Sequence, residues 1–113
     1  MKNILSIIFV LFLSASFGQE KAPKVQQISF KTSAQCGMCK ERIEEELNYT
    51  KGIIFAELDV DSQILTVKYK TKFLNQEKVK YLVTKIGYNA GEFPRDNKAY
   101  EKLPKCCQDG GHK

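Results

Sequence analysis

Two pairs of cysteines and one histidine are the residues of this chain best suited to chemistry. Cys36 and Cys39 form a Cys-x-x-Cys motif, Cys106 and Cys107 are adjacent, and His112 is the single histidine among 113 residues. Thiolates bind soft metal ions and also exchange with disulfide bonds. The residue types therefore indicate either soft-metal binding or thiol redox chemistry, and the surrounding sequence has to distinguish the two.

The elements around the Cys-x-x-Cys motif predict how it is presented. Apolar and polar residues alternate in 25–31, which is typical of a strand, and residues 40–47 have helical character. The two thiols then lie on a strand-to-helix loop, with Cys39 about one turn into the helix, so both sulfurs can point at one atom. Backbone N–H groups at a helix N-terminus favour the thiolate, which is the form that binds metal.

Two thiolates at this spacing suit a soft ion with few ligands. Cu(I) accepts two or three sulfurs and Hg(II) shares this preference, whereas Zn(II) needs four ligands. An inert disulfide between Cys36 and Cys39 is the structural alternative.

The enzymatic alternative is a thioredoxin-like thiol-disulfide oxidoreductase, which needs a cis-proline facing its motif. None of the three prolines is well placed for that role, and there is no Ser-His-acid set or phosphate loop. We therefore expect a protein that is not an enzyme.

The second cysteine pair lies in a C-terminal tail, residues 95–113, which also contains His112. Adjacent cysteines bridge each other only through a strained ring, so Cys106 and Cys107 are candidate further metal ligands together with His112. The alternative is a passive tail. Twelve residues from Pro94 to Cys106 reach about 40 Å when extended and roughly 25 Å if 96–102 is helical. In the predicted topology the last strand runs away from the Cys-x-x-Cys end, so the tail starts on the far side and has to cross the height of the domain. Folding back to the first pair is therefore tight, and a separate or intermolecular site is equally open.

Residues 24–94 have the element order β-α-β-β-α-β. Alternating strands are predicted at 25–31, 56–60 and 65–69, a second helix ends at Gly87 after an Asn75 N-cap, and 88–93 reads as a final strand. This order predicts an α+β fold of the ferredoxin-like type, with two helices on one face of a four-stranded antiparallel sheet.

With this element order and motif, the chain resembles the heavy-metal-associated domain family. That family includes copper chaperones, N-terminal modules of copper-exporting ATPases and the periplasmic mercury-binding protein. The resemblance rests on the Cys-x-x-Cys at a strand-helix junction, on Lys51-Gly52-Ile53, and on residues 86–90, Ile-Gly-Tyr-Asn-Ala. It implies that Cys36 and Cys39 are the metal ligands and that Tyr88 lies in the loop covering them. It also implies a metallochaperone whose partners are a metal-transporting membrane protein or another metal-binding domain.

The loop before the motif departs from the family pattern at two positions. Ala34 stands where the family has a buried methionine, and Ser33 replaces a glycine, so we expect a more mobile loop. Met38, between the two cysteines, projects from a different loop position, and we expect partial packing or exposure rather than ligation.

Residues 1–18 read as a secretory signal peptide. Lys2 precedes an apolar run from Ile4 to Leu13, and small residues at Ser16 and Gly18 suit a cut before Gln19. The run is shorter than the roughly 20 apolar residues that span a bilayer, so we expect no stable membrane insertion. The mature protein would be exported, to the periplasm or outside the cell. The net charge of the full chain, +5, is spread along the sequence, which argues against nucleic acid as a partner.

Overall fold

The structure is a computed structural model that describes residues 23–109. The predicted signal peptide, residues 1–18, and His112 lie outside the described residues, so both assignments stay predictions.

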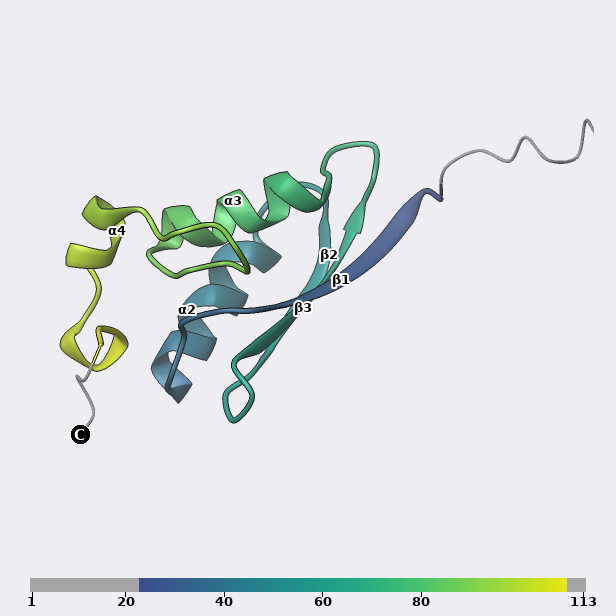
Figure 1. Ribbon diagram of the computed structural model, residues 1–113. Coiled ribbons are helices and arrows are strands. Elements are labelled where there is room, and N and C mark those ends of the chain that lie inside the picture. Colours follow the sequence, from purple (N-terminus) through teal and green to yellow (C-terminus); the bar gives the residue numbers. More distant parts are fainter. Residues whose placement is uncertain (1–22, 110–113) are drawn as a thin grey trace, which may run out of the picture.

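The described chain forms three strands, three α-helical segments and one short 3₁₀ turn (Figure 1). In chain order the elements are β1 (Val25–Lys31), α2 (Gly37–Asn48), β2 (Ile53–Asp59), β3 (Ile64–Lys70), α3 (Gln76–Ile86), α4 (Asn97–Glu101) and η2 (Lys105–Cys107). The expected order of strands and helices is present as far as α3.

The sheet is antiparallel with the order β1-β3-β2, and α2 and α3 lie together on one side of it (Figure 1). Because β3 pairs on both edges, its alternate residues Leu65, Val67 and Tyr69 are completely buried. The helices cover these side chains with stripes that recur every three to four residues. On α2 the stripe is Cys39, Ile43 and Leu47, and on α3 it includes Val79 and Val83. Cys39 therefore belongs to the helix face that packs in the core.

Two predicted helix boundaries agree with the structure. The Asn75 side chain accepts a hydrogen bond of 2.8 Å from the Lys78 N–H and so caps α3. Gly87 ends α3 with a φ of +121°, a conformation that residues with a side chain rarely adopt.

The expected fourth strand does not form in the described chain. Ala90 makes an isolated bridge with Thr32, beside the end of β1, and a second one with Phe93. The Gly91 N–H donates to the Lys31 carbonyl of β1 at 2.8 Å. The backbone turns at Gly91, whose φ is +57°, and Ala90 and Phe93 bond to each other. The prediction of a four-stranded sheet is corrected to three strands plus one bridge, because this turn redirects the chain before a strand can propagate.

The segment after this turn contains the short helix expected within 96–102. The Asp96 carboxylate accepts a hydrogen bond of 3.0 Å from the Ala99 N–H and so caps α4, and the Asp96 N–H donates to the Thr84 carbonyl of α3. Leu103 follows α4 and is buried in the same core as the sheet. The start of the tail is thus packed against the end of α3.

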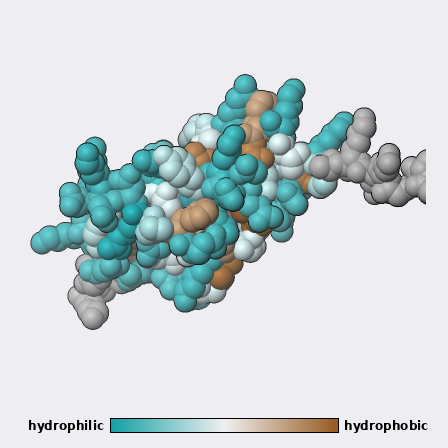
Figure 2. Space-filling view, turned by 45° about the horizontal axis from the view of Figure 1, so that its top comes forward, coloured by the Kyte–Doolittle hydropathy of each residue, from teal (hydrophilic) through white to brown (hydrophobic). Residues whose placement is uncertain are grey.

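The surface is mostly polar on the face shown in Figure 2, with small separate apolar areas. The large exposed apolar side chains come from different elements: Val25, Met38, Tyr49, Ile54, Phe55 and Tyr81. Within residues 23–109, no helix has the length and apolar character needed to cross a bilayer.

Candidate metal centre

The first cysteine pair is positioned by the start of α2. Cys36 occupies the N-cap position in an extended conformation, and Cys39 lies in the first turn of the helix. Their sulfurs are 2.9 Å apart, and both are thiols rather than a disulfide. Cys36 is half-buried, whereas Cys39 is fully buried. One sulfur is therefore held rigidly in the core while the other remains accessible.

The loop before Cys36 is fastened at both peptide groups of Ala34. The Ala34 N–H donates to the Thr32 hydroxyl at 3.2 Å, and its carbonyl accepts from the Gln63 side chain at 3.0 Å. Ala34 is fully buried, and the Ser33 hydroxyl accepts a hydrogen bond of 2.9 Å from the Asn89 N–H. These hydrogen bonds hold the loop in place of the packing that a methionine side chain would provide. They oppose the loop mobility that the sequence led us to expect.

The C-terminal cysteine pair lies against the first pair. The sulfurs of Cys36, Cys106 and Cys107 all lie within 4.8 Å of one another, and those of Cys106 and Cys107 are 3.9 Å apart. The Cys36 thiol also donates to the Cys106 carbonyl at 3.3 Å. The tail does not have to cross the height of the domain, because the turn at Gly91 has already brought the chain back to this end.

Met38 contributes a further sulfur at the edge of the cluster. Its side chain is 51% exposed, and its thioether sulfur accepts a contact of 3.0 Å from the Cys106 thiol. The expected exposure is observed. The contact with Cys106 was not foreseen, since it joins residues 68 positions apart.

The thiols differ in acidity. Burial would raise the pKa of Cys39, but hydrogen bonds from the Cys36 thiol, the Gln35 backbone, Tyr88 and Cys107 lower the pKa overall. Burial raises the pKa of Cys36, and its hydrogen bond to Cys39 raises it further. Burial likewise raises the pKa of Cys107. Among Cys36, Cys39 and Cys107, the buried Cys39 is therefore the thiol whose pKa is lowered.

Tyr88 lies under the sulfurs rather than at the rim. Its side chain is 1% exposed, and its hydroxyl makes no hydrogen bond of ordinary geometry within residues 23–109. Burial raises the pKa of Tyr88, and the neighbouring Cys107 and Cys39 sulfurs raise it further, so the phenol stays protonated. A buried O–H beside the Cys39 and Cys107 sulfurs fits a hydrogen bond to a metal-bound thiolate, whose charge it would stabilise.

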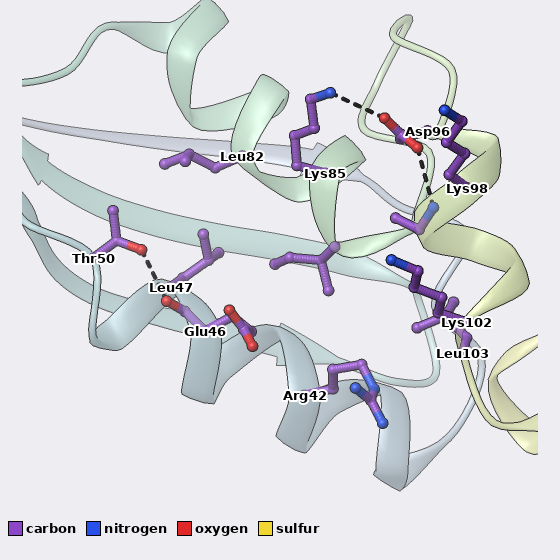
Figure 3. A pocket seen from close by; sticks show the side chains of 12 residues that line it. Arg42, Glu46, Leu47, Thr50, Leu82, Lys85, Asp96, Lys98, Lys102 and Leu103 are labelled. Carbon is purple, nitrogen blue, oxygen red and sulfur yellow. Dashed lines mark hydrogen bonds and ion pairs between the residues drawn. The ribbon is translucent and has the colours of Figure 1, made fainter.

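A groove lies between α2, α3 and α4 (Figure 3). Its volume is about 480 Å³, and its rim includes Arg42, Lys98 and Lys102, while Lys85 is paired with Asp96 at 3.0 Å. None of the four cysteines lines it. The candidate metal centre is therefore the cluster of sulfurs at the start of α2, apart from this groove.

Comparison with known proteins assigns the domain that carries the first cysteine pair to a family. The model of the heavy-metal-associated domain matches residues 30–89, more than half of the chain, so the protein belongs to this family. No protein with a curated description matches at a significant level. The family match ends before the tail, and it includes Cys36, Cys39 and Tyr88 but not Cys106 or Cys107.

Three solved structures illustrate the likeness. A CopZ metallochaperone is 23% identical over 57% of this chain and 98% of its own, with a TM-score of 0.54. Oxidized MerP from Ralstonia metallidurans CH34 is 12% identical over 59% of this chain and 94% of its own, with a TM-score of 0.55. The N-terminal domain of a potential copper-translocating P-type ATPase from Bacillus subtilis, in its Cu(I)-loaded state, is 28% identical over 59% and 85%, with a TM-score of 0.55. The shared part is the compact domain, and a soft metal ion held by cysteines is the chemistry that the family brings to it.

Proposed function

We propose that the protein binds one Cu(I) ion through Cys36 and Cys39 and then transfers or sequesters it. The observation that carries this proposal is the pair of sulfurs 2.9 Å apart at the start of α2. The lowered pKa of Cys39 favours a thiolate at this position. The two sulfurs would have to move only slightly farther apart to hold an ion between them. Cu(I) is favoured over Zn(II) because it is satisfied by two or three sulfurs. Hg(II) is the second candidate cargo, since it has the same ligand preference.

The accessible Cys36 supports a role in transfer. An incoming thiolate can reach the ion from the side of Cys36 while the buried Cys39 still holds it, so the ion need never be released into solution. The partner would be a metal-transporting membrane protein or another metal-binding domain. The Bacillus subtilis ATPase domain, which is described as Cu(I)-loaded, belongs to a protein of the first kind.

The location that suits this role is outside the cytoplasm, after removal of residues 1–18. The mass of the mature protein recovered from the periplasm or medium tests this. A mature N-terminus at Gln19 supports export, and a protein that keeps Met1 at its N-terminus contradicts it.

Competition with a Cu(I)-specific chelator under anaerobic conditions tests the metal site. The Cys36→Ser and Cys39→Ser variants should each lose high-affinity binding, because each lacks one of the two thiolates of the proposed site. Glu45→Ala, an exposed change on the same helix, should bind like the wild type. Wild-type affinity in both serine variants would refute the assignment.

The same preparations separate this function from thiol redox catalysis. A metal carrier should reduce insulin disulfides no faster than the uncatalysed background. Rapid turnover by the metal-free protein would favour an oxidoreductase instead.

A further inference from the structure

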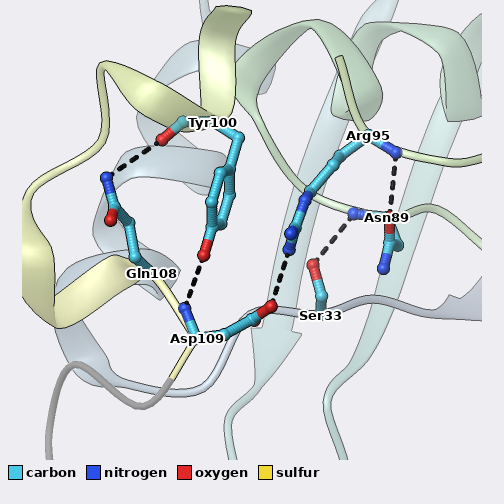
Figure 4. A network of polar contacts seen from close by, with 6 residues as sticks. All are labelled: Ser33, Asn89, Arg95, Tyr100, Gln108 and Asp109. Carbon is cyan, nitrogen blue, oxygen red and sulfur yellow. Dashed lines mark hydrogen bonds and ion pairs between the residues drawn. The ribbon is translucent and has the colours of Figure 1, made fainter. Parts of the chain in front are cut away.

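The tail that carries Cys106 and Cys107 is fixed to the site by a chain of polar contacts (Figure 4). Arg95 donates through its backbone N–H to the Asn89 side chain at 2.9 Å, and Asn89 in turn donates to Ser33 in the loop before Cys36. The Arg95 guanidinium also donates to Asp109 at 3.1 Å, beyond the second cysteine pair. Arg95 thus connects the loop of the first pair to the far end of the tail.

Tyr100 and Gln108 close the tail on itself. The Arg95 guanidinium stacks on the Tyr100 ring, with 3.5 Å to the ring centroid, and the Tyr100 hydroxyl accepts from the Asp109 N–H at 2.8 Å. The Gln108 side chain donates to the Leu103 carbonyl at 3.0 Å and to the Tyr100 carbonyl at 3.3 Å. These bonds bracket the two cysteines on both sides, and Cys107 is only 6% exposed. The second pair is therefore held in a defined place.

That place fits a further ligand to the same ion. Metal–sulfur bonds of about 2.3 Å in a trigonal arrangement put the sulfurs about 4.0 Å apart. The sulfurs of Cys36 and Cys107 lie within 4.8 Å of each other, and Cys107 also interacts with Cys39 and with Tyr88. The Cys106 sulfur lies within the same 4.8 Å of Cys36 and also contacts the exposed Met38 at 3.0 Å. Cys107, through its added interaction with Cys39, adjoins both members of the first pair.

We propose that the tail is a cap whose Cys107 supplies a third thiolate to the ion held by Cys36 and Cys39. This inference rests on the proposed function and specifies how many thiolates bind the ion and what limits its release. Cys106 remains beside the site as a fourth sulfur, which would serve an ion that requires four ligands.

The cap has a consequence for transfer. An incoming thiolate from a partner has to displace Cys107, which is tethered to the site and so competes at a high effective concentration. The ion is held until the tail detaches, and the contacts of Arg95 set how readily this happens. The tail therefore makes the domain hold its ion longer than the same domain without a tail would.

X-ray absorption of the full-length protein loaded with one Cu(I) tests the cap. We expect about three sulfurs around copper in the wild type, two in Cys107→Ser and three in the matched control Cys106→Ser. Affinity from chelator competition should fall at least about tenfold in Cys107→Ser, since a tethered ligand is lost. Because Cys107 is buried, Cys107→Ala is measured as well, and thermal unfolding of each metal-free variant confirms that it folds.

The outcomes separate the cap from the site beneath it. Two sulfurs in the wild type, or an unchanged number in both Cys107 variants, overturns the cap and leaves the Cys36–Cys39 site intact. Binding of a second Cu(I) that Cys106→Ser and Cys107→Ser abolish also overturns it, in favour of a separate site. Full affinity in Cys36→Ser and Cys39→Ser refutes the proposed function, and the cap with it.

The rate of Cu(I) release tests whether the tail limits transfer, without the removal of any sulfur. Arg95→Ala should release Cu(I) to a chelator several-fold faster than the wild type, whereas Lys98→Ala should not. Lys98 is an exposed cation on α4, so the control loses the same charge without the contacts of Arg95. Equal release rates in the wild type, Arg95→Ala and Cys107→Ser would overturn the cap.

Discussion

Replacing Gly87 with alanine should detach the tail from the domain. An added Cβ would lie 3.0 Å from Leu103 Cδ1, 3.1 Å from the Tyr100 nitrogen and 3.2 Å from the Ala99 carbon. Two of these atoms belong to the backbone of α4 and cannot rotate away, so α4 has to move. The absence of a side chain at Gly87 is what lets α4 pack against the end of α3.

The cost has two parts. The positive φ of +121° at Gly87 costs a residue with a side chain about 1–2 kcal/mol. The close contacts add an overpacking cost of about 1–3 kcal/mol. Gly91→Ala is the matched control, because its φ is also positive, +57°, but its Cβ would only meet the flexible Lys80 side chain at 3.6 Å. Gly91→Ala therefore carries the cost of the positive φ without the cost of overpacking.

Thermal unfolding of the metal-free proteins measures the difference. For a domain of this size about 1 kcal/mol corresponds to about 4–8 °C, so Gly87→Ala should melt about 5–20 °C below Gly91→Ala. The alkylation rate of Cys107, resolved by fragment-ion mass spectrometry, reports the position of the tail. It should rise in Gly87→Ala and stay low in Gly91→Ala, because Cys107 is 6% exposed while the tail is docked. Equal melting temperatures with Cys107 still protected would show that α4 does not hold the tail in place.

Three further changes test other parts of the structure. Asn75→Ala should reduce the free energy of unfolding by about 1 kcal/mol in a denaturant titration, while Asn75→Asp should stay near the wild type because aspartate also caps helices; an equal loss in both would contradict the capping role. Ala34→Met, which introduces the residue typical of the family, should destabilise the metal-free protein by about 1–3 kcal/mol, since Ala34 is fully buried and hydrogen-bonded at both peptide groups; a more stable variant would contradict this. Because the pKa of Tyr88 is raised in the folded protein above its usual 10.0, its contribution to stability is complete below pH 10 and is lost as the pH rises beyond it. Tyr88→Phe should therefore show a smaller loss of stability than the wild type above pH 10, and an identical pH profile would mean that the phenol is not buried.

Local patterns in the sequence determined much of the domain. The alternation around Leu65 and Val67 and the helical stripe of Cys39 and Ile43 correspond to β3 and α2 as expected. The Asn75 cap and the Gly87 terminus also follow from single residue types, since capping and positive φ are properties of a residue and its near neighbours. The position of the Cys-x-x-Cys motif could be predicted for the same reason, because its two cysteines are three residues apart at one helix start.

The path of the chain after Tyr88 could not be predicted in this way. Apolar residues in 88–93 are compatible with a fourth strand, and only the tertiary contacts show that Ala90 bridges to Thr32 once and that Gly91 then turns the chain back. That turn changes the geometric argument for the tail, which assumed a last strand running away from the cysteines.

The arrangement of the four thiols was decided by the tertiary structure alone. The sequence shows two cysteine pairs but contains no signal that Cys36 meets Cys106, 70 positions away, or that Arg95 joins the site loop to Asp109. Such contacts depend on how α4 packs against α3 and on loop closure over long separations, which no local periodicity encodes. Residue types therefore determined that this chain carries a soft-metal motif, whereas packing determined that the second pair lies over the first.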